Sequence, residues 1–572
     1  TTVNIEVIVR YLKQTKDKLT LGWFCSMFRK NDSHYQDELF SHYQSMRPSV
    51  AKLLNKTWAP VFYEHVFCKI NEDLFAPMYC LDTGRPNVPV NILMSLEIIK
   101  NMFGYTDQEL IEQFYFNFQV NYALGIRNLG EVYLAERTLY EFRERVYRHI
   151  LEYPEQDEVI FQQFEILTKN FIEQAGIKTD DQRMDSTLIS PNIKKAGRLS
   201  LALDVLVQAV RGIASNMLSD NLKQVLRDSF RTDLLYRTRN QELESRFQKV
   251  LNLMQEVDNL ANKDRNLASK REMVLLKRFL GEQAAFDESK GIWLAKPSSE
   301  IESGSLQSAY DSDATFRNKA GKNHSGYVLN VSETSSKENP IQVITDFSVQ
   351  PNNISDVEMA KERIPIIKQR TDVKDIYLDG GYYGQEVIEM ADELEVNLHY
   401  TDMTGRKAPS DKLSTTSFKF DDDMKIISCP QGKIPFRSDF NPGSKTSSCH
   451  FKHEDCQGCP NFDICPVKTQ KKDRILRVSL KTIQADRVRD QIHNIAVRRE
   501  NTSYRAGIEA TNSALKRGED LNNLYTRGVL KTYLVTAYKI IARNIKQFSR
   551  MALGKLRKPK RPKAGILCPN LG

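Results

Sequence analysis

The sequence contains 572 residues, of which 40% are apolar and 27% charged, and its 82 basic and 73 acidic residues give a net charge of +9. This length predicts roughly three to five domains or one elaborated core, and the composition is ordinary for a globular protein. The apolar runs fall short of the roughly 18 residues that span a membrane, and the first residues lack the basic region of a secretory signal, so membrane, collagen-like and wholly disordered classes are set aside.

The first half of the chain is predicted to be largely helical. Residues 1–75 form a mixed segment with helical periodicity, and apolar residues recur at helical spacing over 91–149. We interpret 76–172 as a helical DNA-binding domain, a function that this pattern allows but does not diagnose. A second helical pattern over 198–283 predicts a helical insertion at 198–305.

Strand patterns surround this insertion. We expect strands within 177–189, 324–331, 341–347, 376–379 and 396–401, and helices at 356–368 and from 385 onward. The alternation predicts an α/β layer inside a multidomain α+β protein. Residues 173–403 are assigned to the first part of this core. Residues 496–550, helical in pattern at 499–516 and 529–550, are assigned to its last part.

The segment between the two parts of the core, 404–495, is predicted to be an irregular insertion with short β-like pieces. Residues 468–505 carry eleven basic and four acidic side chains, and the tail at 551–572 contains six basic residues without an acid at 555–563. A charge run is often only a solvated face, but next to candidate catalytic acids it favours a polyanionic partner.

Three acids stand out by position. Asp185 lies on the first predicted strand of the α/β layer, Asp379 ends a later strand before two glycines, and Glu509 lies on a helix. Ligands of open α/β sheets collect at the carboxyl ends of strands. Taken singly, Asp185 and Asp379 are more simply explained as capping or surface residues. Glu509 is more simply explained as an ion-pair partner of Arg505, four residues earlier on the same helix. Asp313 is predicted to be a turn or capping residue.

Three converging carboxylates suit phosphodiester chemistry. Two divalent ions, held by carboxylate oxygens, can polarise the attacking water or 3′-hydroxyl and steady the leaving oxygen. The repulsion among Asp185, Asp379 and Glu509 would be removed by such cations. Hard divalent cations such as Mg²⁺ or Mn²⁺ would suit such a set of carboxylates.

Five of the nine cysteines crowd into one region. Cys429, Cys456, Cys459 and Cys465 offer four thiolates with a central Cys-x2-Cys pair, which predicts a structural Zn²⁺ site of the zinc-ribbon type. The alternative is a set of free thiols, and Cys449, His450 or His453 could exchange with one ligand. The scattered Cys25, Cys68, Cys80 and Cys568 are predicted to be free thiols.

Taken together, these motifs resemble the bacterial insertion-sequence DDE transposases of the IS-four-like superfamily, and more narrowly the branch designated IS-eleven-eighty-two. The segments that carry the resemblance are Met94 to Leu110, Glu136 to Arg143, Met184 to Thr187, Leu378 to Tyr383 and Arg505 to Lys516. The last family motif runs Tyr, Arg, Glu, Lys with fixed gaps. Arg505, Glu509 and Lys516 fit these gaps, but Thr502 stands at the Tyr position and Tyr504 lies two residues later.

The resemblance implies an RNase H-like catalytic core and a two-metal transposition reaction on double-stranded DNA, namely the terminal inverted repeats and the target. Asp185, Asp379 and Glu509 carry over as catalytic metal ligands, and Arg505 and Lys516 as DNA contacts, to which the basic run adds Arg498 and Arg499. It further implies a homodimer on DNA, no membrane, and a location in the bacterial cytoplasm at the nucleoid. The alternatives are a catalytically silent, domesticated DNA-binding protein and an RNase H-like DNA nuclease without strand transfer.

Overall fold

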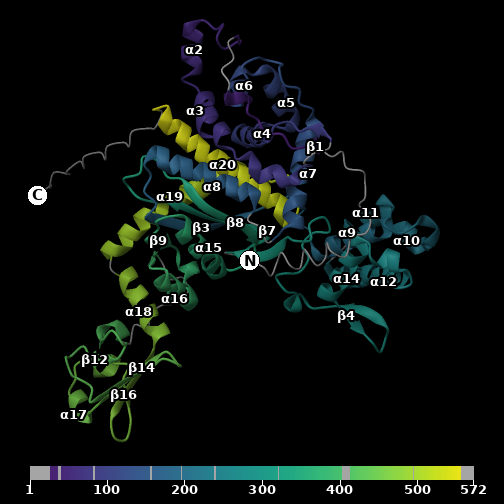
Figure 1. Ribbon diagram of the computed structural model, residues 1–572. Helices are drawn as coiled ribbons and strands as arrows, with labels where there is room; N and C mark the ends of the chain where they lie inside the picture. Colours follow the sequence, from purple (N-terminus) through teal and green to yellow (C-terminus); the bar gives the residue numbers. More distant parts are fainter. Residues whose placement is uncertain are drawn as a thin grey trace, which may run out of the picture.

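The computed structural model describes residues 26–35, 40–80, 84–154, 158–194, 196–236, 240–319, 321–401, 413–493 and 495–554. Three bodies are visible in it: a large central body of helices and a sheet, a helical body at one side, and a small β-rich body at the end of a long helix (Figure 1). The predicted N-terminal residues 1–25 and nearly all of the basic tail lie outside the described residues.

Helices form most of the chain before the sheet, as the periodicity predicted. They are α2 (Pro48–Leu54), α3 (Trp58–His65), α4 (Val90–Phe103), α5 (Asp107–Phe116), α6 (Phe118–Ala123), α7 (Glu136–Glu152) and α8 (Val159–Ala175), beside a short pair of strands, β1 (Ser26–Met27) and β2 (Arg85–Pro86). Helix α4 is buried on nearly all sides. It ends at Gly104 in the left-handed conformation, and Thr106 with Glu109 then forms a capping box that begins α5.

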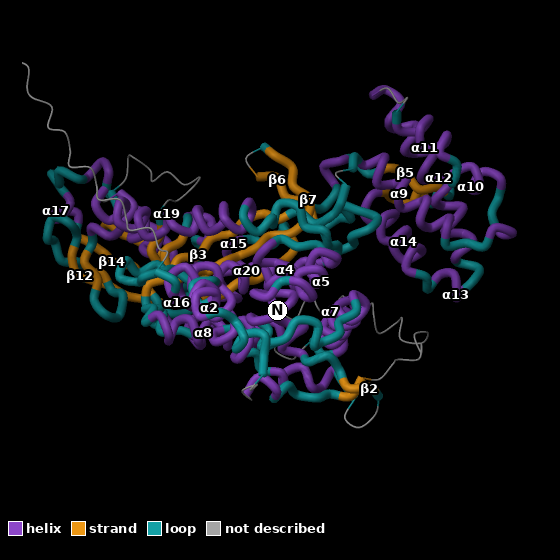
Figure 2. Tube along the Cα trace, turned by 90° about the horizontal axis from the view of Figure 1, so that it is seen from above, coloured by secondary structure: helices purple, strands orange, loops and turns teal. Residues whose placement is uncertain are grey.

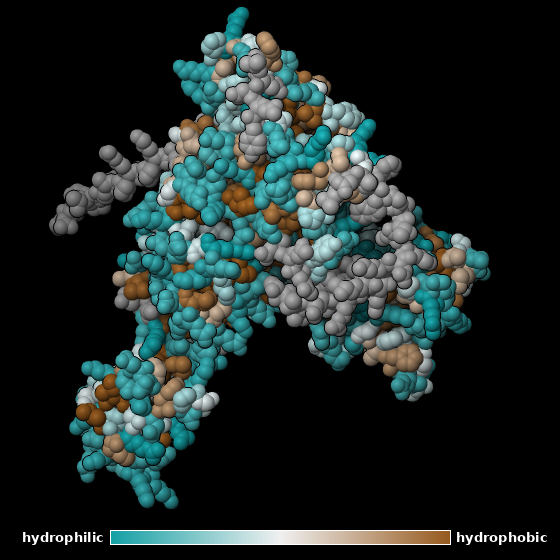
Figure 3. Space-filling model, viewed as in Figure 1, coloured by the Kyte–Doolittle hydropathy of each residue, from teal (hydrophilic) through white to brown (hydrophobic). Residues whose placement is uncertain are grey.

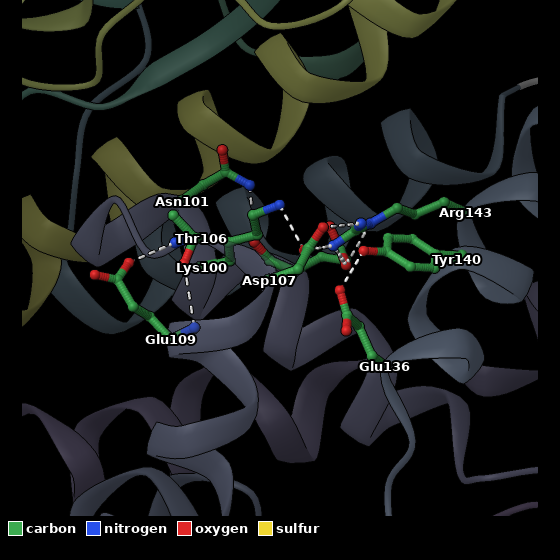
Figure 4. A network of polar contacts seen from close by, with 9 residues as sticks. Lys100, Asn101, Thr106, Asp107, Glu109, Glu136, Tyr140 and Arg143 are labelled. Carbon is green, nitrogen blue, oxygen red and sulfur yellow. Dashed lines mark hydrogen bonds and ion pairs between the residues drawn. The ribbon is translucent and has the colours of Figure 1, made fainter.

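An ion network ties three of these helices together. Arg143 on α7 donates to Glu97 on α4 and to both carboxylate oxygens of Asp107 on α5, and Lys100 on α4 donates to Asp107 as well (Figure 4). Helix α20 (Val529–Ala552), from the far end of the chain, packs against α4 and α8. The N-terminal helices and the C-terminal helix therefore share one hydrophobic core.

The central sheet has β3 (Asp181–Ile189) in its middle. On one side β7 (Lys322–Thr334) pairs antiparallel with β3, and β8 (Ile344–Pro351) and β6 (Thr315–Lys319) pair antiparallel with β7. On the other side, β9 (Asp375–Leu378) runs parallel to β3, and β10 (Asn397–Tyr400) runs parallel to β9. The expected strands are thus present, and the order β8–β7–β3–β9–β10 combines an antiparallel meander with two parallel strands.

Helices cover this sheet. Helix α15 (Asp356–Arg370) joins β8 to β9, and α16 (Gln385–Glu393) joins β9 to β10, both near their predicted positions. Helix α19 (Ile495–Arg517) lies across β3 and β9, and α20 lies against β8. Asp313, predicted to be a turn or cap, accepts a hydrogen bond from Val529 N at the start of α20, with 3.1 Å between donor and acceptor. That prediction is confirmed.

The predicted helical insertion forms the body at one side. It contains α9 (Arg198–Arg211), α10 (Asp220–Val225), α11 (Asp228–Leu235), α12 (Leu243–Ala261), α13 (Arg265–Ala268) and α14 (Arg271–Gln283), followed by a hairpin of β4 (Ala284–Asp287) and β5 (Ile292–Ala295). Its apolar faces enclose a hydrophobic core separate from that of the central body. Figure 2 shows it set apart from the sheet.

The segment predicted to be irregular contains more regular structure than expected. Strands β13 (Arg437–Asn441), β14 (Thr446–Phe451), β16 (Arg474–Ser479) and β15 (Lys468–Thr469) form a four-stranded antiparallel sheet in that order, beside the pair β11 (Lys419–Phe420) and β12 (Ile426–Ser428) and the short α17 (His453–Cys456). Helix α18 (Leu480–His493) then leads back to α19. The prediction missed this order because the buried positions are few, so no long apolar pattern marks the strands.

The visible face is mainly hydrophilic with scattered apolar patches (Figure 3), and none of the helices in the described part of the chain combines the length and apolarity needed to cross a bilayer.

Cys68 is a free thiol, as predicted, but Cys80 is disulfide-bonded, so the expectation of a free thiol there is wrong. The other cysteines in the part of the chain that the structure describes are free.

Candidate active site

Two of the three predicted acids are brought together by the register of the sheet. β3 and β9 run parallel, and Arg183 lies opposite Tyr377. Asp185 and Asp379 each come two residues later, so the same register places them side by side where β9 ends. Asp185 is mostly buried, with 14% of its side chain exposed, whereas 35% of the Asp379 side chain is exposed.

The turn after β9 orients Asp379. Its carboxylate Oδ1 accepts a hydrogen bond from Gly381 N at 2.7 Å and so caps the single turn Gly380–Tyr382. A Cβ atom at residue 381 would lie 2.9 Å from Asp379 Oδ1 and 2.9 Å from Oδ2 of Asp356. Glycine is therefore needed here because two carboxylates flank the backbone, a crowding that was not foreseen from the sequence.

Helix α19 supplies the third acid. Arg498, Arg505, Glu509 and Lys516 are separated by seven, four and seven residues, spacings that place them along one face of the helix. The adjacent side of α19 packs on the sheet, where Ile508 and Leu515 are fully buried. The packing of this apolar side turns the charged face toward the ends of β3 and β9, and Glu509 remains 65% exposed.

The guanidinium of Arg505 lies among the three acids. Its Nη2 is 3.6 Å from Asp185 Oδ1 and 3.7 Å from Asp379 Oδ2, and its Nη1 donates to Glu509 Oε1 at 3.3 Å. Three residues far apart in sequence thus converge on one cation. No group of three or more His, Cys, Asp or Glu side chains in the described part of the chain is spaced as a ready-made metal site. At this cluster, the space between the carboxylates is shared with Arg505.

The environment of Asp185 leaves its charge only partly compensated. Burial raises the pKa of Asp185 to about 6, with Asp379 adding to this effect and Arg505 opposing it. Asn512 Nδ2 donates to Asp185 Oδ2 at 3.0 Å. Burial lowers the pKa of Lys516, which lies near Lys319 and Asp185. A carboxylate in this state gains from a neighbouring divalent cation, which fits the chemistry of a hard oxygen ligand.

Tyr504 does not replace the tyrosine of the family motif. Its ring stacks on Tyr377, with ring centroids 4.5 Å apart, and Tyr377 in turn stacks on His399. The ring therefore lies over β9 and β10 and not beside the acids. Thr502, at the motif position, lines a surface recess of about 540 Å³ together with Arg498, Arg499, Ser503 and Ala506.

Two polar residues of the site were missed from the sequence. Asn512 lies within the recognised α19 segment, and its spacing of seven from Arg505 was the available signal. Asp356 begins α15, where its Oδ1 accepts from Ser186 Oγ at 2.9 Å and its Oδ2 lies 3.6 Å from Arg317 Nη2. An acid in the first turn of a helix is commonly explained by its favourable interaction with the helix dipole. Nothing in the local sequence therefore marked Asp356 as a residue of the site.

Three of the four predicted zinc ligands, Cys429, Cys456 and Cys465, pack against the small apolar core of the β13–β16 body. Cys429 follows β12, Cys456 ends α17, and Cys459 N donates to Cys456 O at 3.3 Å in a tight turn. Burial raises the pKa values of the Cys456 and Cys465 thiols, and other cysteines of the cluster add to this effect. Cys449, fully buried in β14, lies near Cys429, Cys456 and Cys465 and so stays a candidate ligand, as does His453, whereas His450 pairs with Asp473.

Comparison with known proteins matches two segments of the chain to transposase families. A family model described as a transposase DDE domain matches residues 428–549, which include Glu509 and the cysteine cluster. A second, described as a transposase domain (DUF772), matches residues 57–145 in the N-terminal helices. No curated protein and no solved structure matches the chain. The two matches cover less than half of the chain, and they support its assignment to the DDE transposases of bacterial insertion sequences.

Proposed function

We propose that this protein cleaves the ends of its own transposon and joins them to target DNA through a two-metal DDE reaction. The observation that carries the proposal is the meeting of Asp185, Asp379 and Glu509 within 4 Å of one guanidinium. When bound, the divalent ions supply polarisation of the attacking water or 3′-hydroxyl and stabilisation of the leaving oxygen. The three carboxylates would hold Mg²⁺ or Mn²⁺.

The topology of the sheet supports an RNase H-like core. The antiparallel meander β3–β7–β8, with β9 and β10 added parallel to β3, places Asp185 on the central strand and Asp379 at the end of its parallel neighbour. The two long insertions interrupt this core at loops. Glu509 arrives on a helix that crosses the same strands.

The remaining residues of the α19 face have the charge to bind the DNA backbone. Arg498 and Arg499 are exposed beside the recess, and neither they nor Lys516 has an ion-pair partner in the described part of the chain. Arg505 would contact a phosphate while it offsets charge among the acids. Because both transposon ends are joined in one reaction, we expect a homodimer on double-stranded DNA, at the bacterial nucleoid.

A structural zinc ion in the β13–β16 body is a separate part of the proposal. Cys429, Cys456 and Cys465 pack on a small apolar core, and Cys459 N donates to Cys456 O in a tight turn. Four thiolates would close the shell of the ion and stabilise a body that has little core of its own. We expect one zinc per chain by elemental analysis, and we expect Cys459→Ser to lose it while Cys68→Ser retains it. A wild-type protein purified without chelator that lacks zinc would contradict this assignment.

The test of function measures strand cleavage of DNA that carries the sequences flanking the protein's own gene, in the presence of Mg²⁺ or Mn²⁺. The wild-type protein is compared with the Glu509→Gln variant. Cleavage by the wild type alone, followed by products joined to target DNA, is the expected result. Cleavage without joined products would favour a nuclease. Salt-sensitive binding without cleavage by either protein would favour the catalytically silent DNA-binding protein.

A further inference from the structure

The fit between α19 and β3 depends on one buried arginine. Arg183 lies two residues before Asp185 on β3 and faces the same side of the sheet. It lies directly opposite Glu333 on β7, and its Nε donates to Glu333 Oε1 at 2.8 Å. Only 10% of the Arg183 side chain and 2% of the Glu333 side chain are exposed.

The other end of this ion pair reaches the helix that carries Glu509. Arg183 Nη1 donates to the backbone carbonyl of Tyr504 at 2.8 Å, and Thr511 Oγ1 donates to Glu333 Oε2 at 2.8 Å. The pair therefore makes one contact on each side of residue 507 in α19. Burial raises the pKa of Glu333, while Arg183, Thr511 and Arg543 oppose the shift.

Gly507 allows helix α19 to lie close to the Arg183 side chain. A Cβ atom built on Gly507 would lie 2.0 Å from Arg183 Nη1 and 2.2 Å from Arg183 Cζ. The flat guanidinium thus occupies the space that any other side chain would need. Glycine in a helix interior is otherwise unfavourable relative to alanine, so local helix stability does not account for this residue.

We propose that Arg183 is a positioning residue that sets the distance between Asp185 on β3 and Glu509 on α19, with Gly507 as the matching space on the helix. This inference rests on the proposed function, because it concerns the spacing of the carboxylates that carry the reaction. The Arg183–Glu333 pair holds the helix by Tyr504 and Thr511. Arg183 itself is mostly buried and is held by its bonds to Glu333 and to the Tyr504 carbonyl.

The central test is Gly507→Ala in the full-length protein. The added methyl group clashes with the Arg183 guanidinium, and while the buried Arg183–Glu333 pair holds, α19 gives way. A displacement of about 1 Å costs roughly 100-fold in rate when it separates catalytic groups. We expect that loss in single-turnover cleavage, weaker Mn²⁺ binding measured without DNA by electron paramagnetic resonance, and unchanged DNA affinity. Gly281→Ala, in α14 with open space around it, is the matched control and should match wild type.

A second change relieves the same clash from the strand. Arg183→Lys keeps a positive charge for Glu333 but removes the planar group that lies against residue 507. Combined with Gly507→Ala, it should recover much of the lost cleavage rate and Mn²⁺ affinity. A double variant no better than Gly507→Ala would overturn the inference, since the loss would not then arise from contact with Arg183.

Thr511 offers a variant that adds no bulk. Thr511→Val removes the hydrogen bond to Glu333 and should lower the cleavage rate several-fold, whereas Thr511→Ser keeps the hydroxyl and should not. Wild-type cleavage and Mn²⁺ binding in Gly507→Ala would overturn the positioning role and leave the proposed function intact. A wild-type protein that neither cleaves nor binds Mn²⁺ would overturn both.

Discussion

Two clusters of acids and cations in this protein have opposite electrostatic outcomes. In the N-terminal helices, Arg143 and Lys100 donate to Asp107 at 2.5–2.9 Å, and although burial would raise its pKa, these bonds lower it to about 2 (Figure 4). At the candidate active site, Arg505 lies 3.6 Å from Asp185, and burial raises the pKa of that carboxyl to about 6.

The difference lies in the balance of charge. The N-terminal network pairs two acids, Glu97 and Asp107, with two cations, and every contact is a direct hydrogen bond. The candidate active site gathers three acids around one arginine at longer distances. In the N-terminal cluster each acid is paired with a cation, and these pairs stabilise the fold. The second cluster keeps unbalanced negative charge that a divalent cation can neutralise, which is the property that a catalytic metal site needs.

The largest expected effect is at Asp185. Asp185→Asn should lower metal-dependent cleavage by roughly 1,000-fold or more, because a ligand of the ions is lost. The melting temperature without metal should not fall, because the ionised carboxylate is only partly compensated in its buried position. Thermal unfolding beside a cleavage assay measures both. A clear drop in melting temperature would show that the two clusters do not differ in the way described.

Arg143→Met should give the converse result. It leaves Glu97, of which 3% is exposed, without its charged partner, and breaking a buried pair in this way costs about 3–5 kcal/mol. Denaturant unfolding should show this loss, while the cleavage rate per folded molecule stays near the wild-type value. Arg137→Ala, which breaks an exposed pair with Glu141 on the same helix, is the control and should change stability little.

A smaller effect is expected from pH. The pKa of Asp107 is about 2 in the folded protein against an ordinary value of 3.8, so its contribution to stability is present above pH 4 and is lost as the pH falls toward 2. The contribution is about 2 kcal/mol. Asp107→Asn should remove this part of the acid dependence of unfolding. An unchanged acid dependence in the variant would place the sensitivity in other carboxylates.

The smallest effect concerns the exposed cations of α19. Arg498→Ala should weaken DNA binding to a similar degree on all sequences and reduce the slope of log affinity against log salt by about 1, as expected for one lost phosphate contact. Protein stability should not change, because Arg498 has no ion-pair partner among the described residues. A sequence-dependent loss would instead indicate a base contact.

Local patterns were enough to predict much of the fold. The strands at β3, β7, β9 and β10 and the helices α15, α19 and α20 lie near their predicted ranges, because alternating or helical apolar spacing is visible within each segment. The β13–β16 sheet escaped prediction because its few buried residues leave no such pattern. The disulfide at Cys80 escaped for a different reason, since pairing of distant cysteines depends on their separation in space.

By itself, the sequence determined which carboxylates and which helix face carry charge, because those features follow from residue type and spacing along the chain. Only the tertiary structure decided how they meet. The register of β3 against β9 brings Asp185 beside Asp379, and Arg505 lies among the three acids. Arg183 fills the space left by Gly507. These relations join residues more than a hundred positions apart, and only packing in three dimensions can bring them into contact.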